Sequence, residues 1–217
     1  MLLSIAEEIM LLLLEDDKGG FVHVPEISMR CILSGAVLME LALMDKIDTD
    51  LERLIVVDSE PVDDEILDPI LRRLAEDNEQ HDTRHWVELC STDADDIRRR
   101  ALNRLCQAGI LEKKDDRFLW MFKTRRYPLI DGKIEREVKH RIMSILFSAE
   151  IPEPRDIIII VLVDACGLFR HLLSEKEHKR TRERISAIRK MDLIGQAVTN
   201  SVREIEASLA LALHPPF

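Results

Sequence analysis

Aromatic residues and glycine are both scarce in this sequence. Phe, Trp and Tyr together make up 4% of the chain, and glycine occurs 7 times in 217 residues. So few aromatics argue against a base-stacking platform or an aromatic-rich sandwich, and so few glycines argue against an all-β fold full of tight turns. The apolar residues, 46% of the chain, are mostly Leu, Ile, Val and Ala, which favours packed helices.

Paired cysteines and catalytic signatures are also missing. The four cysteines, Cys31, Cys90, Cys106 and Cys166, form no CxxC pair, and we expect reduced thiols in a cytoplasmic protein. The sequence contains no glycine-rich phosphate loop and no GxSxG motif. It therefore predicts a protein that is not an enzyme and that holds no cofactor.

Neither of the two strongly apolar stretches has the features of a targeting or membrane-spanning segment. The N-terminal "MLLSIAEEIMLLLLEDD" lacks a basic n-region and a small-residue cleavage site, and Glu7 and Glu8 interrupt it. The stretch "IIIIVLVDACGLF", which begins at Ile157, is too short to cross a bilayer and predicts a buried core helix.

One pair of histidines has the spacing of metal ligands. His81 and His85 lie four residues apart, with Asp82 and Glu88 nearby, and would share one face of a helix. The surrounding stretch is polar and offers no obvious third ligand. We therefore predict a solvated helix face here and no metal site.

Apolar periodicity and capping residues predict a mainly α fold. Ser4 and Glu7 form a capping box for a first helix, which the glycines at 19 and 20 would end. The next helix, 28–44, is apolar on almost every side and is expected at the centre of a helical bundle. Nothing indicates a linker, so we expect a single domain over 1–217. Amphipathic helices and small β-hairpins are expected around the central helix, with helices at 83–90, 93–108, 133–147 and 156–173 and hairpins at 46–59 and 110–123.

The net charge of −10 conceals a basic segment. From Arg98 to Arg141 there are 14 Lys and Arg against 6 Asp and Glu, a local charge of +8, which leaves −18 for the rest. A solvated face paired with neighbouring acids would explain these arginines. An anion site would explain them too, because guanidinium groups suit the phosphate of DNA or of a lipid headgroup. The helix that ends at Gly109 before the 110–123 hairpin is a join typical of winged-helix DNA-binding domains.

The order of motifs along the chain is more informative than any one of them. Five segments occur in register, "LLSIAEEIMLLLLEDDKG", "SGAVLMELALMDKI", "WVELCS", "RRALNRLCQAGIL" and "RFLWMFKTRRYPLIDG". From Leu3 to about Phe147 this order resembles the Golgi phosphoprotein 3 family of phosphoinositide-binding peripheral membrane proteins. The resemblance implies a mostly helical fold with a central bundle. It also implies that the 110–123 hairpin serves self-association and lies near the membrane. The helix–Gly109–hairpin join would then be a feature of this family and would not indicate DNA binding.

The headgroup site of the family's eukaryotic members is only partly matched. Aligned through "GAVLMELAL", the family's tryptophan and first arginine fall on Pro25 and Ser34. The two family arginines that precede the hairpin fall on Asp95 and Arg98, so one position of the four is kept. These departures indicate a divergent relative, of prokaryotic rather than Golgi type.

We therefore predict a peripheral membrane or adaptor module on the cytosolic face of a membrane, homo-oligomeric through the 110–123 hairpin. The residues expected to meet anionic, phosphoinositide-like lipid headgroups are Arg98, Arg99, Arg125, Arg126 and Ser34. Each cationic residue close to such a surface contributes about 1 kcal/mol. The net charge argues against nucleic acid as a partner. Two alternatives stay open, a winged-helix-like DNA-binding regulator and a protein-interaction scaffold whose arginines pair with local acids.

Overall fold

In the part of the chain that the structure describes, helices are accompanied by two small antiparallel strand pairs. The structure, a computed structural model, describes residues 2–14, 20–49, 53–77, 79, 81–115, 125–191 and 196–205. Its helices are α1 (Ile5–Leu12), α2 (Glu26–Leu43), α3 (Leu67–Glu76), α4 (Thr83–Ser91), α5 (Ala94–Gln107), α6 (Lys133–Phe147), α7 (Pro154–Ala165), α8 (Phe169–Leu172), α9 (Glu175–Arg189) and a further helix at 196–205. The strands are β1 (Ile47–Thr49), β2 (Leu54–Val56), β3 (Lys114–Asp115) and β4 (Arg125–Arg126), paired antiparallel as β1–β2 and β3–β4. The predicted fold class, mainly α with small β-hairpins, is confirmed.

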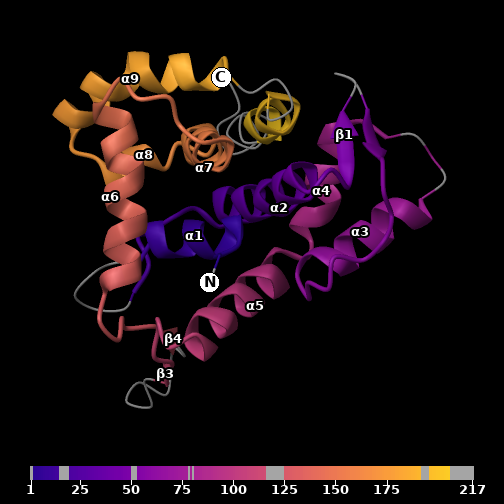
Figure 1. The fold of residues 1–217 in the computed structure, drawn as a ribbon, viewed down its shortest axis with the longest axis horizontal. Coiled ribbons are helices and arrows are strands. Elements are labelled where there is room, and N and C mark those ends of the chain that lie inside the picture. The colour runs from indigo at the N-terminus through magenta and orange to yellow at the C-terminus, as the bar shows by residue number, and fades with distance from the viewer. Residues whose placement is uncertain are drawn as a thin grey trace, which may run out of the picture.

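Helices α1 and α2 lie at the centre of the fold. In Figure 1, α6, α7, α8 and α9 lie on one side of this pair, and α3, α4 and the β1–β2 hairpin lie on the other. Helix α2 packs against α3, α4, α5 and α7, while α1 packs against α5, α6 and α7. Every residue of α1 is buried, and so is every residue of α2 from Cys31 to Leu41. The prediction of a central apolar helix at 28–44 is confirmed, with observed bounds that begin two residues earlier.

The capping box at the start of α1 forms as predicted, but the helix is shorter than expected. The Ser4 hydroxyl accepts a hydrogen bond from the Glu7 backbone N–H at 3.2 Å, and the Glu7 carboxylate accepts one from the Ser4 N–H at 2.6 Å. The helix ends at Leu12 because the chain then turns into an antiparallel bridge between Leu14 and Phe21. Residues 15–19 lie outside the described part of the chain.

Two acidic side chains of α1 are buried and paired with arginines from much later in the sequence. The Glu7 carboxylate lies 3.2 Å from the Arg104 guanidinium of α5. The Glu8 carboxylate lies 3.1 Å from Arg155 of α7 and also pairs with Arg141 of α6. A buried charge is costly unless it is paired, so these contacts fix α1 against three other helices. They also pair Arg104 and Arg141 of the basic segment with buried acids.

Glycine follows the ends of α5 and α7, and only the first of these two ends was predicted. Gly109 has φ +70°, which a side chain would disfavour, and the chain passes from α5 through it toward β3. The predicted helix 156–173 is instead two helices, because Gly167, with φ +62°, breaks it between α7 and α8. At the β3–β4 hairpin, Lys114 pairs with Arg126. The tip of this hairpin, 116–124, lies outside the described residues.

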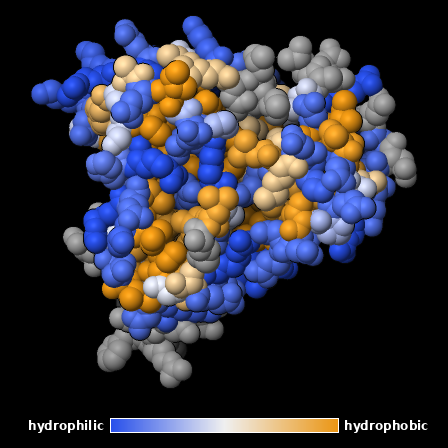
Figure 2. Space-filling view, in the orientation of Figure 1, coloured by the Kyte–Doolittle hydropathy of each residue, from blue (hydrophilic) through white to orange (hydrophobic). Residues whose placement is uncertain are grey.

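The surface is mainly hydrophilic on the face that Figure 2 shows. Hydrophobic residues gather there beside α1 and over the β1–β2 hairpin, where Ile55 and Val57 are 45% and 61% exposed. None of the described helices is both long enough and apolar enough to cross a membrane.

Candidate anion-binding site

A cleft of about 360 Å³ opens where the connector 20–25 passes the beginnings of α2 and α5. The Leu14–Phe21 bridge turns the chain back after α1, and Pro25 then begins α2. As a result, the starts of two helices that are far apart in the sequence lie side by side. The residues that line the cleft are Phe21, Val22, His23, Val24, Glu26, Met29, Arg30, Ala94, Asp95 and Arg98.

Both helix N-termini at this cleft have a partial positive charge. Their N-cap residues, Pro25 for α2 and Asp93 for α5, make no side-chain hydrogen bond to the first turn. The first backbone N–H groups of a helix have no partner within the helix, and the helix dipole adds about half a positive charge at that end. Such an end is a natural place for a phosphate or carboxylate.

Arg98 is the side chain of the cleft best suited to meet an anion. Its guanidinium carbon lies 4.9 Å from the centre of the Phe21 ring, and that ring packs against Tyr127 at 6.1 Å. The cation–π contact orients the guanidinium without neutralising it. Among the residues that the structure describes, no carboxylate forms an ion pair with Arg98.

Arg30 adds a second guanidinium, but two carboxylates accompany it. Its Nη2 lies 2.6 Å from the Glu26 carboxylate and 3.8 Å from the Asp95 carboxylate. The side chains of Glu26 and Asp95 are 77% and 84% exposed, so these ion pairs contribute little and can open at small cost. With Arg98 included, the two arginines and two acids leave the cleft close to neutral.

The other arginines of α5 are neutralised outside the cleft. Arg99 is exposed and pairs with Asp96, and Arg100 lies 2.6 Å from the same Asp96 carboxylate. The hydrogen bonds from Arg100 and Arg99 hold the pKa of Asp96 below its ordinary value of 3.8. The hypothesis of a solvated face paired with acids therefore describes Arg99 and Arg100 well. Arg98 differs because it is turned toward the cleft.

Of three further residues predicted for the site, Ser34 is buried, and the side chains of the other two are not described. Ser34 is fully buried, and its hydroxyl donates to the Arg30 carbonyl at 2.8 Å. It does not line the cleft, so we leave it out of the candidate site. Arg125 and Arg126 pair with β3 through their backbones, but their side chains lie outside the described residues. Their part in membrane contact stays a prediction.

The sequence reasoning missed Arg30 and Phe21. Arg30 lies one helical turn before Ser34 and so faces the same side of α2, a relation that the i, i+4 spacing could have indicated. Phe21 gave no such signal, because only the turn after α1 brings it to Arg98.

Comparison with known sequences identifies the family. The sequence profile of Golgi phosphoprotein 3 (GPP34) matches residues 5–205, nearly the whole chain. The chain belongs to the Golgi phosphoprotein 3 family. It is also 28% identical to vacuolar protein sorting-associated protein 74 of Schizosaccharomyces pombe (strain 972 / ATCC 24843) over 169 residues, which cover 69% of this chain and 50% of that protein. The chain thus spans about half the length of this curated relative.

Membership in the Golgi phosphoprotein 3 family bears on several predictions. It confirms the family that the motif order resembled, and it supports the prediction that the chain is not an enzyme. The fission yeast relative is eukaryotic, so the inference of a prokaryotic source is not supported. The α5–Gly109–hairpin join occurs here in a Golgi phosphoprotein 3 domain, which removes the main reason for the DNA-binding alternative.

Proposed function

We propose that this protein is a peripheral membrane adaptor that binds phosphate-bearing lipid headgroups in the cleft between the connector 20–25, α2 and α5. The observation that carries the proposal is Arg98, held over the Phe21 ring beside two helix N-termini. Family membership supports the membrane assignment and a site on the cytosolic face. The alternative is a protein-interaction scaffold without an anion site, and binding to vesicles distinguishes it from the adaptor.

Binding to a headgroup requires that Arg30 exchange partners. A phosphate that enters the cleft would replace the carboxylates of Glu26 and Asp95 at the Arg30 guanidinium. Both carboxylates are largely exposed, so they can turn to solvent at a cost of less than about 1 kcal/mol each. Guanidinium groups then hold the phosphate with charge-assisted hydrogen bonds.

One such cleft binds a membrane weakly. Each cationic residue close to an anionic membrane contributes about 1 kcal/mol, so Arg30 and Arg98 together supply about 2 kcal/mol, which the carboxylates of Glu26 and Asp95 largely offset. Arg99, Arg125 and Arg126 would add to a general attraction if they face the same surface. Self-association through the 110–123 hairpin would place several clefts on one membrane and raise the overall affinity without new contacts.

The test is vesicle flotation with the full chain. Vesicles of phosphatidylcholine alone are compared with vesicles that also contain phosphatidylserine or a phosphoinositide, for wild type and Arg98→Glu. The matched control is Arg182→Glu, the same charge change at an exposed position of α9, which lies across the molecule from α5 (Figure 1).

We expect flotation only with anionic vesicles, a preference for the phosphoinositide, and a loss of about 30-fold in affinity for Arg98→Glu, because two charges change. The control should float like wild type. A soluble inositol phosphate should compete with the vesicles if the cleft binds the headgroup itself. If wild type stays in solution with every vesicle, or if both variants lose binding equally, the cleft is not a headgroup site.

A further inference from the structure

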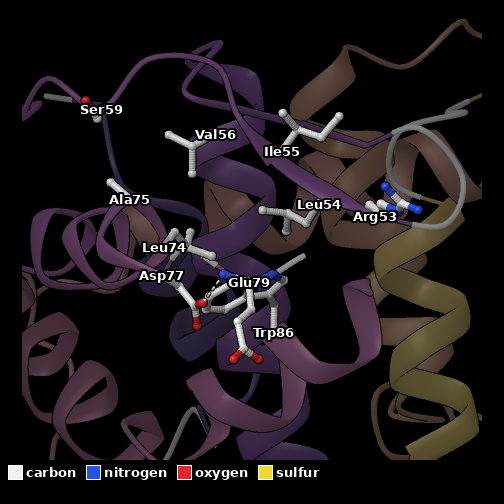
Figure 3. A pocket seen from close by; sticks show the side chains of 10 residues that line it. All are labelled: Arg53, Leu54, Ile55, Val56, Ser59, Leu74, Ala75, Asp77, Glu79 and Trp86. Carbon is white, nitrogen blue, oxygen red and sulfur yellow. Dashed lines mark hydrogen bonds between the residues drawn. The ribbon is translucent and has the colours of Figure 1, made fainter. Parts of the chain in front are cut away.

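A second cavity, of about 490 Å³, lies between the β1–β2 hairpin and helices α3 and α4. Leu54 and Val56 of β2 line it on one side, and Asp77, Glu79 and Trp86 line it on the other. In Figure 3 the carboxylates of Asp77 and Glu79 lie next to Trp86. The edge of this cavity carries a group of ligand atoms that the lipid-binding proposal does not use.

Three side chains bring potential metal ligands together at the α3–α4 junction. Asp77 is the C-cap of α3, His81 precedes α4, and His85 belongs to its first turn. One ligand atom from each lies within 4.8 Å of the other two. The Asp77 carboxylate is already 3.4 Å from His81 Nε2. All three residues are half-buried, so an ion from solvent can reach them while water is partly excluded.

The local structure keeps the two imidazoles next to each other. The Asp82 carboxylate caps α4 by accepting a hydrogen bond from the His85 N–H at 2.8 Å. The His81 and His85 rings stack with centroids 3.8 Å apart, and each meets the buried Trp86 ring edge-on, at 5.6 and 5.4 Å. The Trp86 indole therefore forms one wall beside both imidazoles.

We propose that Asp77, His81 and His85 form a binding site for a transition-metal ion, with Zn²⁺ as the best match. Two imidazole nitrogens and one carboxylate oxygen are a donor set that suits Zn²⁺, whereas Mg²⁺ and Ca²⁺ prefer a shell of oxygens. Tetrahedral ligands about 2.0–2.2 Å from Zn²⁺ lie about 3.3–3.6 Å from one another. The Asp77–His81 separation is already in that range.

Completion of the site needs a rotation of one imidazole ring. Because the two rings are stacked nearly parallel, at 13°, one imidazole must rotate so that its nitrogen turns toward the same point as the other. The fourth position can be taken by water or by the Glu79 carboxylate, which is 82% exposed and lies 3.8 Å from His81 Nε2. A bound ion would tie the end of α3 to the start of α4 and so fix one edge of the cavity.

The sequence showed the histidine pair but not its partner. Asp77, His81 and His85 are spaced by four residues each, yet no single helix holds all three, because α3 ends at Glu76 and α4 begins at Thr83. Asp82, the acid nearest to the pair in the sequence, is occupied as the cap of α4. Asp77 comes close to the two histidines only through the fold of the α3–α4 junction.

The test uses tag-free full-length protein freed of metal with a chelator. Zn²⁺ is titrated by calorimetry, and Co²⁺ is titrated by visible absorption, which is intense when Co²⁺ has four ligands in a tetrahedral arrangement. We expect one ion per chain, no response to Mg²⁺, and an affinity about tenfold or more weaker in Asp77→Asn, His81→Ala and His85→Ala. The control His171→Ala, at an exposed histidine of α8, should bind like wild type.

Wild-type protein that binds Zn²⁺ no more tightly than His81→Ala would overturn the proposal and leave the histidines as a stacked pair only. Circular dichroism of the metal-free variants shows whether each one folds. If a variant does not fold, NMR of wild type decides the question, because Zn²⁺ bound at this site must shift the ring signals of His81 and His85. Shifts confined to other histidines would place the ion elsewhere.

Discussion

Asp95 gives the sharpest test of the headgroup cleft, because the proposal predicts that changing it improves binding. Its carboxylate lies at the first turn of α5 and 3.8 Å from the Arg30 guanidinium, where it competes with an incoming phosphate. Asp95→Asn removes one negative charge from the cleft. Asp95→Arg changes the charge by two units and restores the residue type that the family has at this position.

The size of the gain follows from the number of charges. At about 1 kcal/mol for each charge near an anionic membrane, Asp95→Asn should bind vesicles about fivefold more tightly and Asp95→Arg about 30-fold. The cost to folding should be small. A carboxylate near a helix N-terminus contributes about 0.3–1 kcal/mol, and an exposed ion pair contributes less than about 1 kcal/mol.

The assay is cosedimentation with phosphoinositide-containing vesicles at low and at physiological salt. The matched control is Glu183→Arg, the same charge change at an exposed position of α9. The gain for Asp95→Arg should shrink as salt rises, because exposed charges are screened. If Asp95→Arg and Glu183→Arg improve binding equally, only net charge matters, and the reasoning that places the headgroup between α2 and α5 is refuted.

Three further predictions concern stability and reactivity. Arg104→Ala leaves Glu7 buried without its partner and should lower the free energy of unfolding by about 3–5 kcal/mol, as measured by urea denaturation. The pKa of Asp96 is lower in the folded state than in the unfolded state. The stability that this carboxylate supplies is therefore present above about pH 4 and is lost as the pH falls through the folded-state pKa. In Asp96→Asn the free energy of unfolding should fall less steeply as the pH is lowered through that range. Burial raises the pKa of the Cys90 thiol to about 12, and iodoacetamide at pH 8 should therefore leave Cys90 intact and modify the partly exposed Cys106 first, as peptide mass spectrometry can show.

Local patterns predicted those features that depend on neighbours along the chain. The Ser4 capping box, the end of α5 before Gly109 and the burial of the central helix all follow from residue type and spacing within a few positions. The pairing of Asp96 with Arg100 is of the same kind, because i, i+4 charges meet on one helix face.

The candidate site could not be predicted in this way, because it depends on contacts between distant segments. Arg98 lies over an aromatic ring at the cleft because the Leu14–Phe21 bridge brings Phe21 there. The end of α7 before Gly167 was not predicted, because apolar residues continue on both sides of this glycine and suggest one unbroken helix. The family resemblance pointed to Arg98, but it gave no indication that Arg30 could act from the turn before Ser34.

The buried charges of α1 have a consequence for how the protein is made. Glu8 leaves the ribosome before its partner Arg155, which follows 147 positions later in the sequence. At about 5–20 residues per second, this interval lasts about 7–30 s. Until Arg104, Arg141 and Arg155 have all been made, the two acids of α1 lack their full set of partners. Helix α1 is therefore expected to stay undocked, and available to chaperones, for much of that interval.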